Sequence, residues 1–302
     1  MVSAAPSRMG LSPLAVLAAA LAVCGIVAIA WLGTLRLPFA VAQLSIGDPD
    51  LPENLIVFLP GSGCEPAARQ ATKFFTGLTG RWKVVALEKP GVRRFQPFGC
   101  TAEFTLNADF DKLIARQTQF ARGVLAAHPE AKLKVLVGYS EGGLAAPEVA
   151  AGAPGFTHLV AASAGAMDGE ALVYAAGAQL SGPVKAARRM AAITQTPDAI
   201  DRFAWNDSYA YLSSLMRLRP LSAYAKLDLP ILMIHGGRDA EVPLAATEIA
   251  QRAFSRAGKT NLTVSIDPRS DHRLGLDDPQ KQAVLLAKML NWMAPAPSKS
   301  AS

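Results

Sequence analysis

Between residues 54 and 293 the chain alternates short, continuously apolar runs with longer segments in which apolar positions recur at helical spacing. Short apolar runs of this kind predict strands that are covered on both faces of a sheet. In the run 262–266 only alternate positions are apolar, which is typical of an edge strand. The predicted strands are Leu55–Leu59, Trp82–Leu87, Leu133–Val137, Thr157–Ala162, Ile231–Ile234 and Leu262–Ile266.

The segments between the predicted strands have the length and periodicity of helices. The final helix has the clearest start, because Asp278 is placed to cap it and Pro279 suits its first position. Strands separated by helices indicate βαβ units. We therefore predict an α/β fold over residues 43–293, with a mostly parallel central sheet and helices on both faces. The predicted helices are Pro66–Leu78, Ala108–Ala127, Glu141–Ala151, Leu244–Ala257 and Pro279–Met293.

Residues 166–228 interrupt this alternation with several short helical pieces and no clear strand. The pieces are separated at residues 182–183, 196–197 and 219–220, where a proline follows Gly, Thr or Arg. An insertion of this length is typical of a functional lid or pocket wall. We predict a helical cap, and it remains open whether the cap forms a pocket, packs on the sheet, or does both.

The N-terminal region is almost wholly apolar from Leu14 to Gly33. About twenty residues at a rise of about 1.5 Å span the hydrocarbon thickness of a bilayer. We predict that residues 1–42 form a membrane anchor or an uncleaved signal segment. Small-x-small sites at 28–30 and 40–42 leave cleavage open, and Arg8 and Arg36 flank the stretch too symmetrically to give an orientation. Residues 294–302 are predicted to be a disordered tail.

The composition narrows the class of protein. With 302 residues, of which 51% are hydrophobic and 18% charged, the chain is neither a disordered polymer, a coiled coil nor a disulfide-rich miniprotein. The net charge of +6 is not gathered in any dense Lys/Arg run, so no nucleic-acid partner is expected. The four histidines lack metal-ligand spacing, so we expect neither a metal nor another cofactor. The oligomeric state stays open.

Cys64 and Cys100 lie in Gly/Pro-rich loops, each shortly after a predicted strand. If those strands are neighbours, the two loops leave the same edge of the sheet and a disulfide can join them. A disulfide agrees with an exported or membrane-anchored domain on the extracytoplasmic (periplasmic) side. Two free thiols in a reducing cytosol are the alternative.

The segment from Gly138 to Gly142 matches the pattern G-x-S-x-G, with Ser140 at its centre. A predicted strand precedes it and a predicted helix begins at Glu141. Small residues at both ends of the pattern permit a sharp turn from strand to helix. Such a turn exposes the serine hydroxyl and directs the free N–H groups of the helix N-terminus at whatever the serine attacks. Ser140 is therefore a candidate nucleophile.

A serine hydroxyl needs a base to take its proton, and the base needs a third group to hold it. In an open α/β sheet, such groups gather at the carboxyl ends of the strands. Asp239 and His272 each follow a predicted strand. His128 and His158 precede strands and are expected at the opposite end of the sheet, and His235, which ends its strand, is expected to be structural.

The chain resembles the α/β-hydrolase superfamily from Asn54 to Met293. The resemblance rests on the elbow GYSEG, the acid in HGGRD, the histidine in SDHR, and their order. It implies that Ser140 is the nucleophile, Asp239 the acid and His272 the base. The alternatives for the acid are Asp267 and Asp271.

The resemblance also implies an oxyanion-binding loop after an early strand. Residues 59–63 occupy that place, with Pro60 where the family commonly has histidine. We expect the first donor to be the N–H of Ser62, with Gly63 as the alternative, and the second to be the N–H of Glu141. The Glu141 side chain is also explained as a first-turn acid that the helix dipole favours.

These features predict a serine hydrolase that cleaves an ester or thioester of a small or medium substrate through an acyl-enzyme on Ser140. A serine peptidase or amidase of short peptides, an acyltransferase, and a non-catalytic binding protein of the same fold are the alternatives. Charged residues after the strand 82–87 either meet an anionic substrate or are solvated; they are Glu88, Lys89, Arg93 and Arg94.

Overall fold

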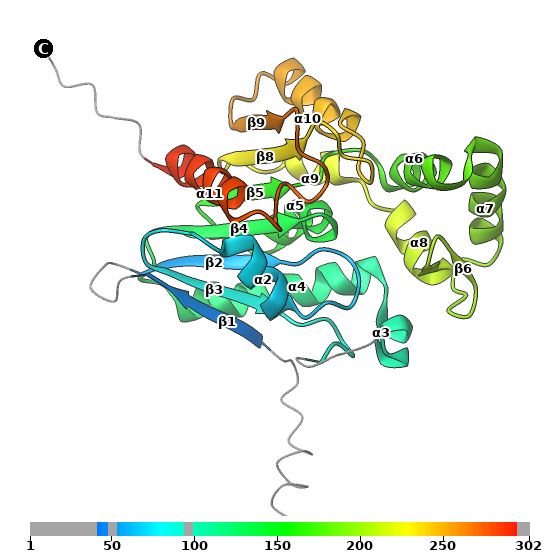
Figure 1. Ribbon diagram of the computed structural model, residues 1–302, viewed down its shortest axis with the longest axis horizontal. Coiled ribbons are helices and arrows are strands. Elements are labelled where there is room, and N and C mark those ends of the chain that lie inside the picture. Colours follow the sequence, from blue (N-terminus) through cyan, green and yellow to red (C-terminus); the bar gives the residue numbers. More distant parts are fainter. Residues whose placement is uncertain (1–40, 48–52, 94–98, 295–302) are drawn as a thin grey trace, which may run out of the picture. The chain divides into compact units, whose positions relative to one another are not determined.

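The computed structural model describes residues 41–47, 53–93 and 99–294 (Figure 1). The apolar segment predicted as a membrane anchor or signal, and the predicted tail from residue 295 onward, lie outside these residues. Among the described helices, none has both the length and the apolar character needed to cross a bilayer.

A seven-stranded sheet forms the centre of the described chain, in the order β1-β3-β2-β4-β5-β8-β9. All neighbouring strands are parallel except β1, which runs antiparallel to β3. The predicted α/β fold with a mostly parallel sheet is confirmed, and the six predicted strands agree with β2–β5, β8 and β9 to within about two residues at each end. The strands are β1 (Val41–Ile46), β2 (Asn54–Leu59), β3 (Trp82–Leu87), β4 (Lys134–Tyr139), β5 (His158–Ala162), β8 (Ile231–Gly236) and β9 (Leu262–Asp267).

Strand β1 was not predicted. It begins at Val41, so its first two residues fall within the segment 1–42 that is predicted as an anchor or signal. Its signal is an alternation in which Ala42 is buried and Leu44 and Ile46 are half-buried, with the exposed polar residues Gln43 and Ser45 between them. The longer apolar stretch that precedes it in the sequence obscured this short edge-strand pattern.

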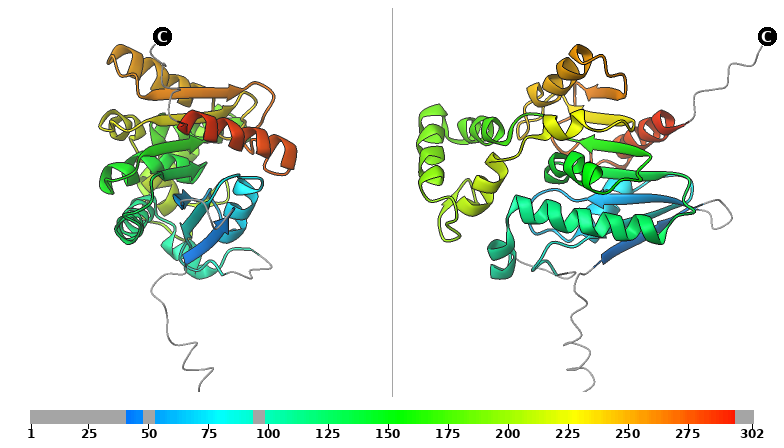
Figure 2. Two further views of the ribbon diagram at one scale, coloured as in Figure 1. Left: turned by 90° about the vertical axis from the view of Figure 1, so that its left-hand side faces the viewer. Right: turned by 180° about the vertical axis from the view of Figure 1, so that it is seen from behind.

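Both faces of the sheet are covered, which explains why the central strands are continuously apolar (Figure 2). Along β2, Ile56 and Phe58 join the core beneath α2 (Ala67–Phe75) and α11 (Pro279–Met293). Leu55 and Val57 point to the other face and join the core with the helices there. Those helices are α4 (Phe110–Ala127), α5 (Glu141–Gly152) and α10 (Ala245–Arg256); the short α3 (Ala102–Asn107) precedes α4.

The predicted helical insertion forms a cap. Figure 1 shows α6, α7, α8 and β6 together to one side of the sheet. The absence of strands that was predicted for this segment is wrong, because a small antiparallel hairpin forms there. Trp205 and Asn206 make its turn with φ of 50° and 73°. The elements are α6 (Gly169–Ser181), α7 (Pro183–Gln195), β6 (Phe203–Ala204), β7 (Asp207–Ser208), α8 (Tyr209–Met216) and α9 (Pro220–Ala225), of which α9 packs on α5.

Candidate active site

Ser140 lies on the sharp turn between β4 and α5. Its backbone has φ 52° and ψ −117°, a conformation that side chains rarely adopt. The turn is too crowded for larger neighbours: a Cβ on Gly138 would lie 2.4 Å from the Gly142 carbonyl oxygen, and a Cβ on Gly142 would lie 2.0 Å from the Leu59 carbonyl oxygen. The G-x-S-x-G spacing is therefore a steric requirement of this turn.

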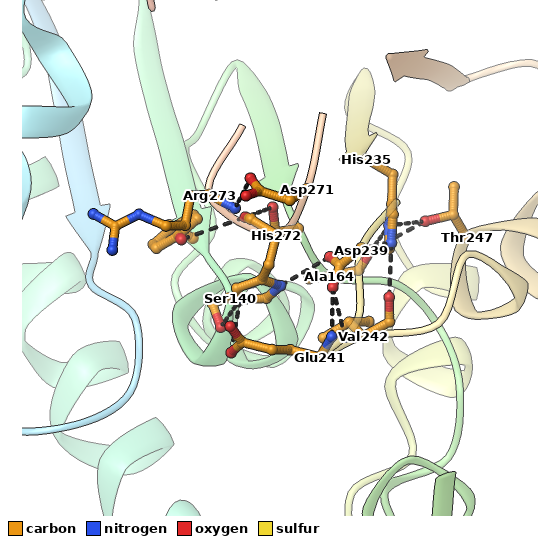
Figure 3. Close-up of polar contacts among 12 residues, drawn as sticks. Ser140, Ala164, His235, Asp239, Glu241, Val242, Thr247, Asp271, His272 and Arg273 are labelled. Carbon is orange, nitrogen blue, oxygen red and sulfur yellow. Dashed lines mark hydrogen bonds and ion pairs between the residues drawn. The ribbon is translucent and has the colours of Figure 1, made fainter. Parts of the chain in front are cut away.

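The structure brings Ser140, His272 and Asp239 together from three parts of the chain (Figure 3). Ser140 Oγ lies 2.8 Å from His272 Nε2, and His272 Nδ1 lies 2.8 Å from Asp239 Oδ2. Asp239 follows β8 and His272 follows β9, so all three groups meet at the carboxyl ends of parallel strands, where the sequence placed them.

Asp239 is held in place by backbone groups of its own loop. Its Oδ1 accepts hydrogen bonds from the N–H groups of Glu241 at 2.9 Å and Val242 at 2.8 Å. Burial raises the pKa of Asp239, but the hydrogen bonds from His272, Val242 and Glu241 outweigh burial, and the pKa is lowered below its ordinary value. Asp239 is therefore ionised at neutral pH.

The alternative acids, Asp267 and Asp271, serve local turns instead. Asp267 accepts hydrogen bonds from the Ser270 hydroxyl and the Arg269 N–H, and Asp271 accepts one from the Arg273 N–H. Neither contacts the His272 ring in the described structure, so Asp239 is the acid that the fold assigns to His272.

The backbone of His272 is also fixed. The Ser163 hydroxyl donates to the His272 carbonyl at 2.6 Å, and the Tyr139 hydroxyl lies 3.4 Å from the same oxygen. His235 is fully buried behind the site, with Nδ1 2.8 Å from the Thr247 hydroxyl and Nε2 3.0 Å from the Val242 carbonyl (Figure 3). This placement agrees with the structural role predicted for His235. His128 and His158 lie at the amino ends of β4 and β5, away from Ser140.

The predicted oxyanion loop is anchored by three groups. The Gly61 N–H donates to Gln70 Oε1 at 2.7 Å, and Lys89 Nζ donates to the Gly61 carbonyl at 2.7 Å. Beside Gly63, a disulfide joins Cys64 to Cys100, with their Cα atoms 5.4 Å apart. Ser62 lies between these anchors and lines the same cavity as Ser140.

The charged residues after β3 do not behave as expected. Glu88 accepts the N–H groups of Ala67 and Ala68 and so caps α2, while Lys89 is buried and forms an ion pair with Glu141 at 2.5 Å. Neither Glu88 nor Lys89 is a freely solvated charge, and the Glu141 side chain is more than a first-turn acid. Arg93 is exposed, and Arg94 lies outside the described residues.

A sequence model of the alpha/beta hydrolase family matches residues 56–284. The chain belongs to the alpha/beta hydrolase family. No curated protein sequence matches it.

Solved structures of this family resemble the chain in fold at low sequence identity. Est1E from Butyrivibrio proteoclasticus has 15% identity and a TM-score of 0.57, with 84% of this chain and 95% of that chain covered. A lipase-esterase related protein from Clostridium acetobutylicum has 15% identity and a TM-score of 0.55, with 84% and 99% covered. The acylaminoacyl peptidase of Pyrococcus horikoshii has 14% identity and a TM-score of 0.56; 84% of this chain is covered, but it spans only 41% of the peptidase.

Two cavities of this alpha/beta hydrolase meet at the catalytic-triad candidates. One, of about 200 Å³, has polar walls that include Gln70, Lys73 and Arg273. The other, of about 220 Å³, extends beneath the cap. Both are lined by Ser62, Ser140, Glu241 and His272, and the walls of the second are mainly apolar, from Leu144, Leu172, Val173, Ala176, Leu180, Trp205, Leu212, Leu215 and Val242.

The sequence indicates that the insertion is rich in aromatic residues, Trp205 and Tyr211 among them, but it does not assign any of them to a cavity wall. Asp207 and Tyr211 line the cavity beneath the cap, and Glu241 Oε2 lies 3.6 Å from His272 Nε2. The aromatic content of the cap was the available signal, but its placement depends on a tertiary contact between the hairpin and α6. Across residues 41–47, 53–93 and 99–294 no group of three or more His, Cys, Asp or Glu side chains is arranged to hold a metal ion.

Proposed function

We propose that the protein is a serine hydrolase that cleaves esters or thioesters through an acyl-enzyme on Ser140. The observation that carries this proposal is the continuous set of contacts from Ser140 Oγ to His272 and on to the ionised Asp239. This arrangement supplies a nucleophile, a base and a group that orients the base.

In the proposed reaction, Ser140 Oγ attacks the substrate carbonyl carbon while its proton passes to His272 Nε2. The carbonyl oxygen becomes an oxyanion, which accepts hydrogen bonds from the N–H groups of Ser62 and Glu141. As the intermediate collapses, the C–O or C–S bond to the leaving group breaks and His272 returns the proton to that group. Water then attacks the acyl-enzyme with His272 again as base, and Ser140 leaves with the proton.

Asp239 acts on this cycle through His272. Its carboxylate accepts the Nδ1–H, which leaves the lone pair of Nε2 facing Ser140 Oγ. The same negative charge stabilises the imidazolium that forms when Ser140 loses its proton. A lowered pKa suits this role, because the carboxylate then stays charged across the neutral range.

The cavity beneath the cap favours an apolar acyl group. Its aliphatic and aromatic walls begin at Ser140 and extend to Trp205, while the polar cavity on the other side of Ser140 suits a leaving group. The similarity in fold to the lipase-esterase related protein is in keeping with an ester substrate.

A second candidate is the hydrolysis of aminoacyl or short peptide amides, and Asp207 favours it. This carboxylate lines the cavity beneath the cap and is open to solvent, and no ion pair to it is found among the described residues. A substrate ammonium group could pair with it there. The similarity in fold to the acylaminoacyl peptidase also supports this alternative.

A substrate panel separates the two. We expect p-nitrophenyl esters of increasing acyl length to be hydrolysed faster than p-nitroanilides of amino acids, with no turnover by Ser140→Ala. Faster cleavage of the aminoacyl anilides, abolished by the same substitution, would favour the peptidase. Equal turnover by the parent and Ser140→Ala would contradict both.

We also propose that the domain functions on the oxidising side of a membrane, exported or anchored by the apolar N-terminal segment. The Cys64–Cys100 pair supports this, because disulfides persist in oxidising compartments. In protein isolated without reductant, thiol titration should find neither cysteine free. Two free thiols at these positions would remove the support.

A further inference from the structure

Lys89 is a buried cation that makes two hydrogen bonds and one ion pair. Its Nζ donates to the Gly61 carbonyl at 2.7 Å and to the Gly63 carbonyl at 3.3 Å, and it pairs with Glu141 Oε1 at 2.5 Å. Only 8% of the Lys89 side chain and 6% of the Glu141 side chain are exposed. Burying both charges is costly unless they are paired and hydrogen-bonded, so the arrangement depends on all of these contacts being made together.

The contact between Lys89 and the Gly61 carbonyl also fixes the direction of the Ser62 N–H. The peptide from Gly61 to Ser62 is trans, so its N–H points away from its C=O. Because Lys89 holds the Gly61 oxygen, the Ser62 N–H must point away from Lys89. The preceding peptide is fixed as well, since the Gly61 N–H donates to Gln70 Oε1 at 2.7 Å.

The same cation is linked to the second donor. Glu141 supplies the other backbone N–H proposed to bind the oxyanion, and its carboxylate is the partner of Lys89. From α8 of the cap, the Tyr211 hydroxyl donates to Glu141 Oε2 at 2.6 Å. Lys89 therefore connects the loop at residues 61–63 to the start of α5, and Tyr211 connects both to the cap.

We propose that Lys89 is a positioning residue that sets the orientation of the Ser62 N–H relative to the N–H of Glu141 and so assembles the oxyanion hole. This rests on the proposed serine hydrolase function. Oxyanion donors act mainly on the transition state, so losing their orientation lowers kcat more than it raises KM. For Lys89→Met we expect kcat to fall about 10²–10³-fold, as for the loss of one oxyanion donor.

Lys89→Met leaves Glu141 buried without its cation, which threatens folding. Lys89→Met/Glu141→Gln removes both charges at similar side-chain length and keeps an acceptor for Tyr211. Lys259→Met is the matched control, because Lys259 Nζ likewise binds two backbone carbonyls, at 2.8 and 2.9 Å, and a carboxylate at 3.4 Å, but lies at the amino end of β9.

The experiment measures kcat per active site and KM for a p-nitrophenyl ester, with active sites counted by complete fluorophosphonate titration of the full-length proteins. Counting labelled sites removes the contribution of misfolded molecules. We expect kcat per labelled site to fall about 100-fold or more in the double variant, with KM within about threefold of the parent and Lys259→Met unchanged. A kcat per labelled site like that of the parent, or an equal loss in Lys259→Met, would overturn the proposal. A parent that neither labels nor hydrolyses esters would instead contradict the proposed function.

Discussion

At the scale of single residues, the site combines a strained nucleophile with several tightly held neighbours. Ser140 carries φ 52° and ψ −117°, where only glycine is free of steric cost. His272 and Asp239 are fixed by backbone contacts on the sides that face away from Ser140. The residue that must expose its hydroxyl is therefore itself held in a strained conformation.

Ser140→Gly should be more stable than Ser140→Ala. Both variants lack the hydroxyl. Glycine relieves the backbone strain of Ser140, which is about 1–3 kcal/mol. Part of this gain is offset, because glycine loses more chain entropy than alanine on folding, about 0.5–1 kcal/mol. We expect a net difference of about 1 kcal/mol in the free energy of unfolding, measured by urea denaturation. Equal stability of the two variants would mean that the turn is not strained.

The ionisation of Asp207 makes the free energy of unfolding depend on pH. Burial and the charge of Glu141 raise its pKa to about 6, although Lys89 opposes them. An acid whose folded pKa is raised contributes stability that is complete below its unfolded pKa, near 3.8, and is lost as pH rises through about 6.

Asp207→Asn should therefore gain stability relative to the parent between about pH 4 and pH 7. We expect the gain to be small, because the Asp207 residue is exposed to solvent and its charge is screened. Urea denaturation midpoints of both proteins at the two pH values test this. A difference that does not change with pH would count against the raised pKa.

Lys89 shows what a single sequence leaves hidden at this scale. Its neighbours Glu88 and Pro90 look like a solvated loop, yet it is buried because the loop at 61–63 and the start of α5 close over it. The triad was predictable because each member follows a strand, and the parallel sheet places strand ends together. No such rule places a lysine beneath a loop and the first turn of a helix.

At the scale of elements, the hairpin and α6 together close the cavity beneath the cap. The Trp205 ring packs on Gly177, where an added Cβ would lie 2.3 Å from the ring. Its Nε1 donates to the Ser181 hydroxyl at 3.2 Å, and the Arg189 guanidinium lies 5.4 Å from the ring centroid. These contacts hold the ring as a fixed wall of the cavity.

Trp205→Ala should shift the preferred ester toward longer acyl chains. Removing the ring extends the apolar cavity, so long-chain esters gain contacts and short-chain esters lose them. The ratio of kcat/KM for long and short p-nitrophenyl esters measures this, with Trp292→Ala in α11 as the control. An unchanged chain-length profile would show that the substrate does not reach Trp205.

The elements that escaped prediction are the shortest ones. β1 has six residues beside a long apolar stretch, and β6 and β7 have two residues each. Strands this short carry little periodic signal, and their pairing comes from tertiary contacts. The breaks at 182–183 and 219–220 were informative, since α7 and α9 each begin at the proline.

At the scale of the whole molecule, the alternation of strands and helices along the chain was enough to predict the fold. Such a chain forms right-handed βαβ units, and its helices must cover both faces of the sheet. The same order brought the Cys64 and Cys100 loops to one edge, after the neighbouring strands β2 and β3. The cavity shapes were not predictable, because they depend on how the cap packs against the strand ends.

Removing the disulfide should lower global stability. Cys64 and Cys100 are 36 residues apart, and closing a loop of that length stabilises the folded state by about 4 kcal/mol on the chain-entropy model. We expect Cys64→Ala/Cys100→Ala to unfold at lower urea concentration with a loss of that order. A double variant as stable as the oxidised parent would contradict this contribution.

The central claim is that the Ser140 hydroxyl is activated by His272. The most direct measurement is fluorophosphonate labelling, with the adduct located by peptide mass spectrometry, of the parent, Ser140→Ala and His272→Ala. We predict one adduct on Ser140 in the parent, none in Ser140→Ala, and labelling of His272→Ala that is slower by orders of magnitude. Labelling of Ser140→Ala at the parent rate, or an adduct on another residue, would contradict the account.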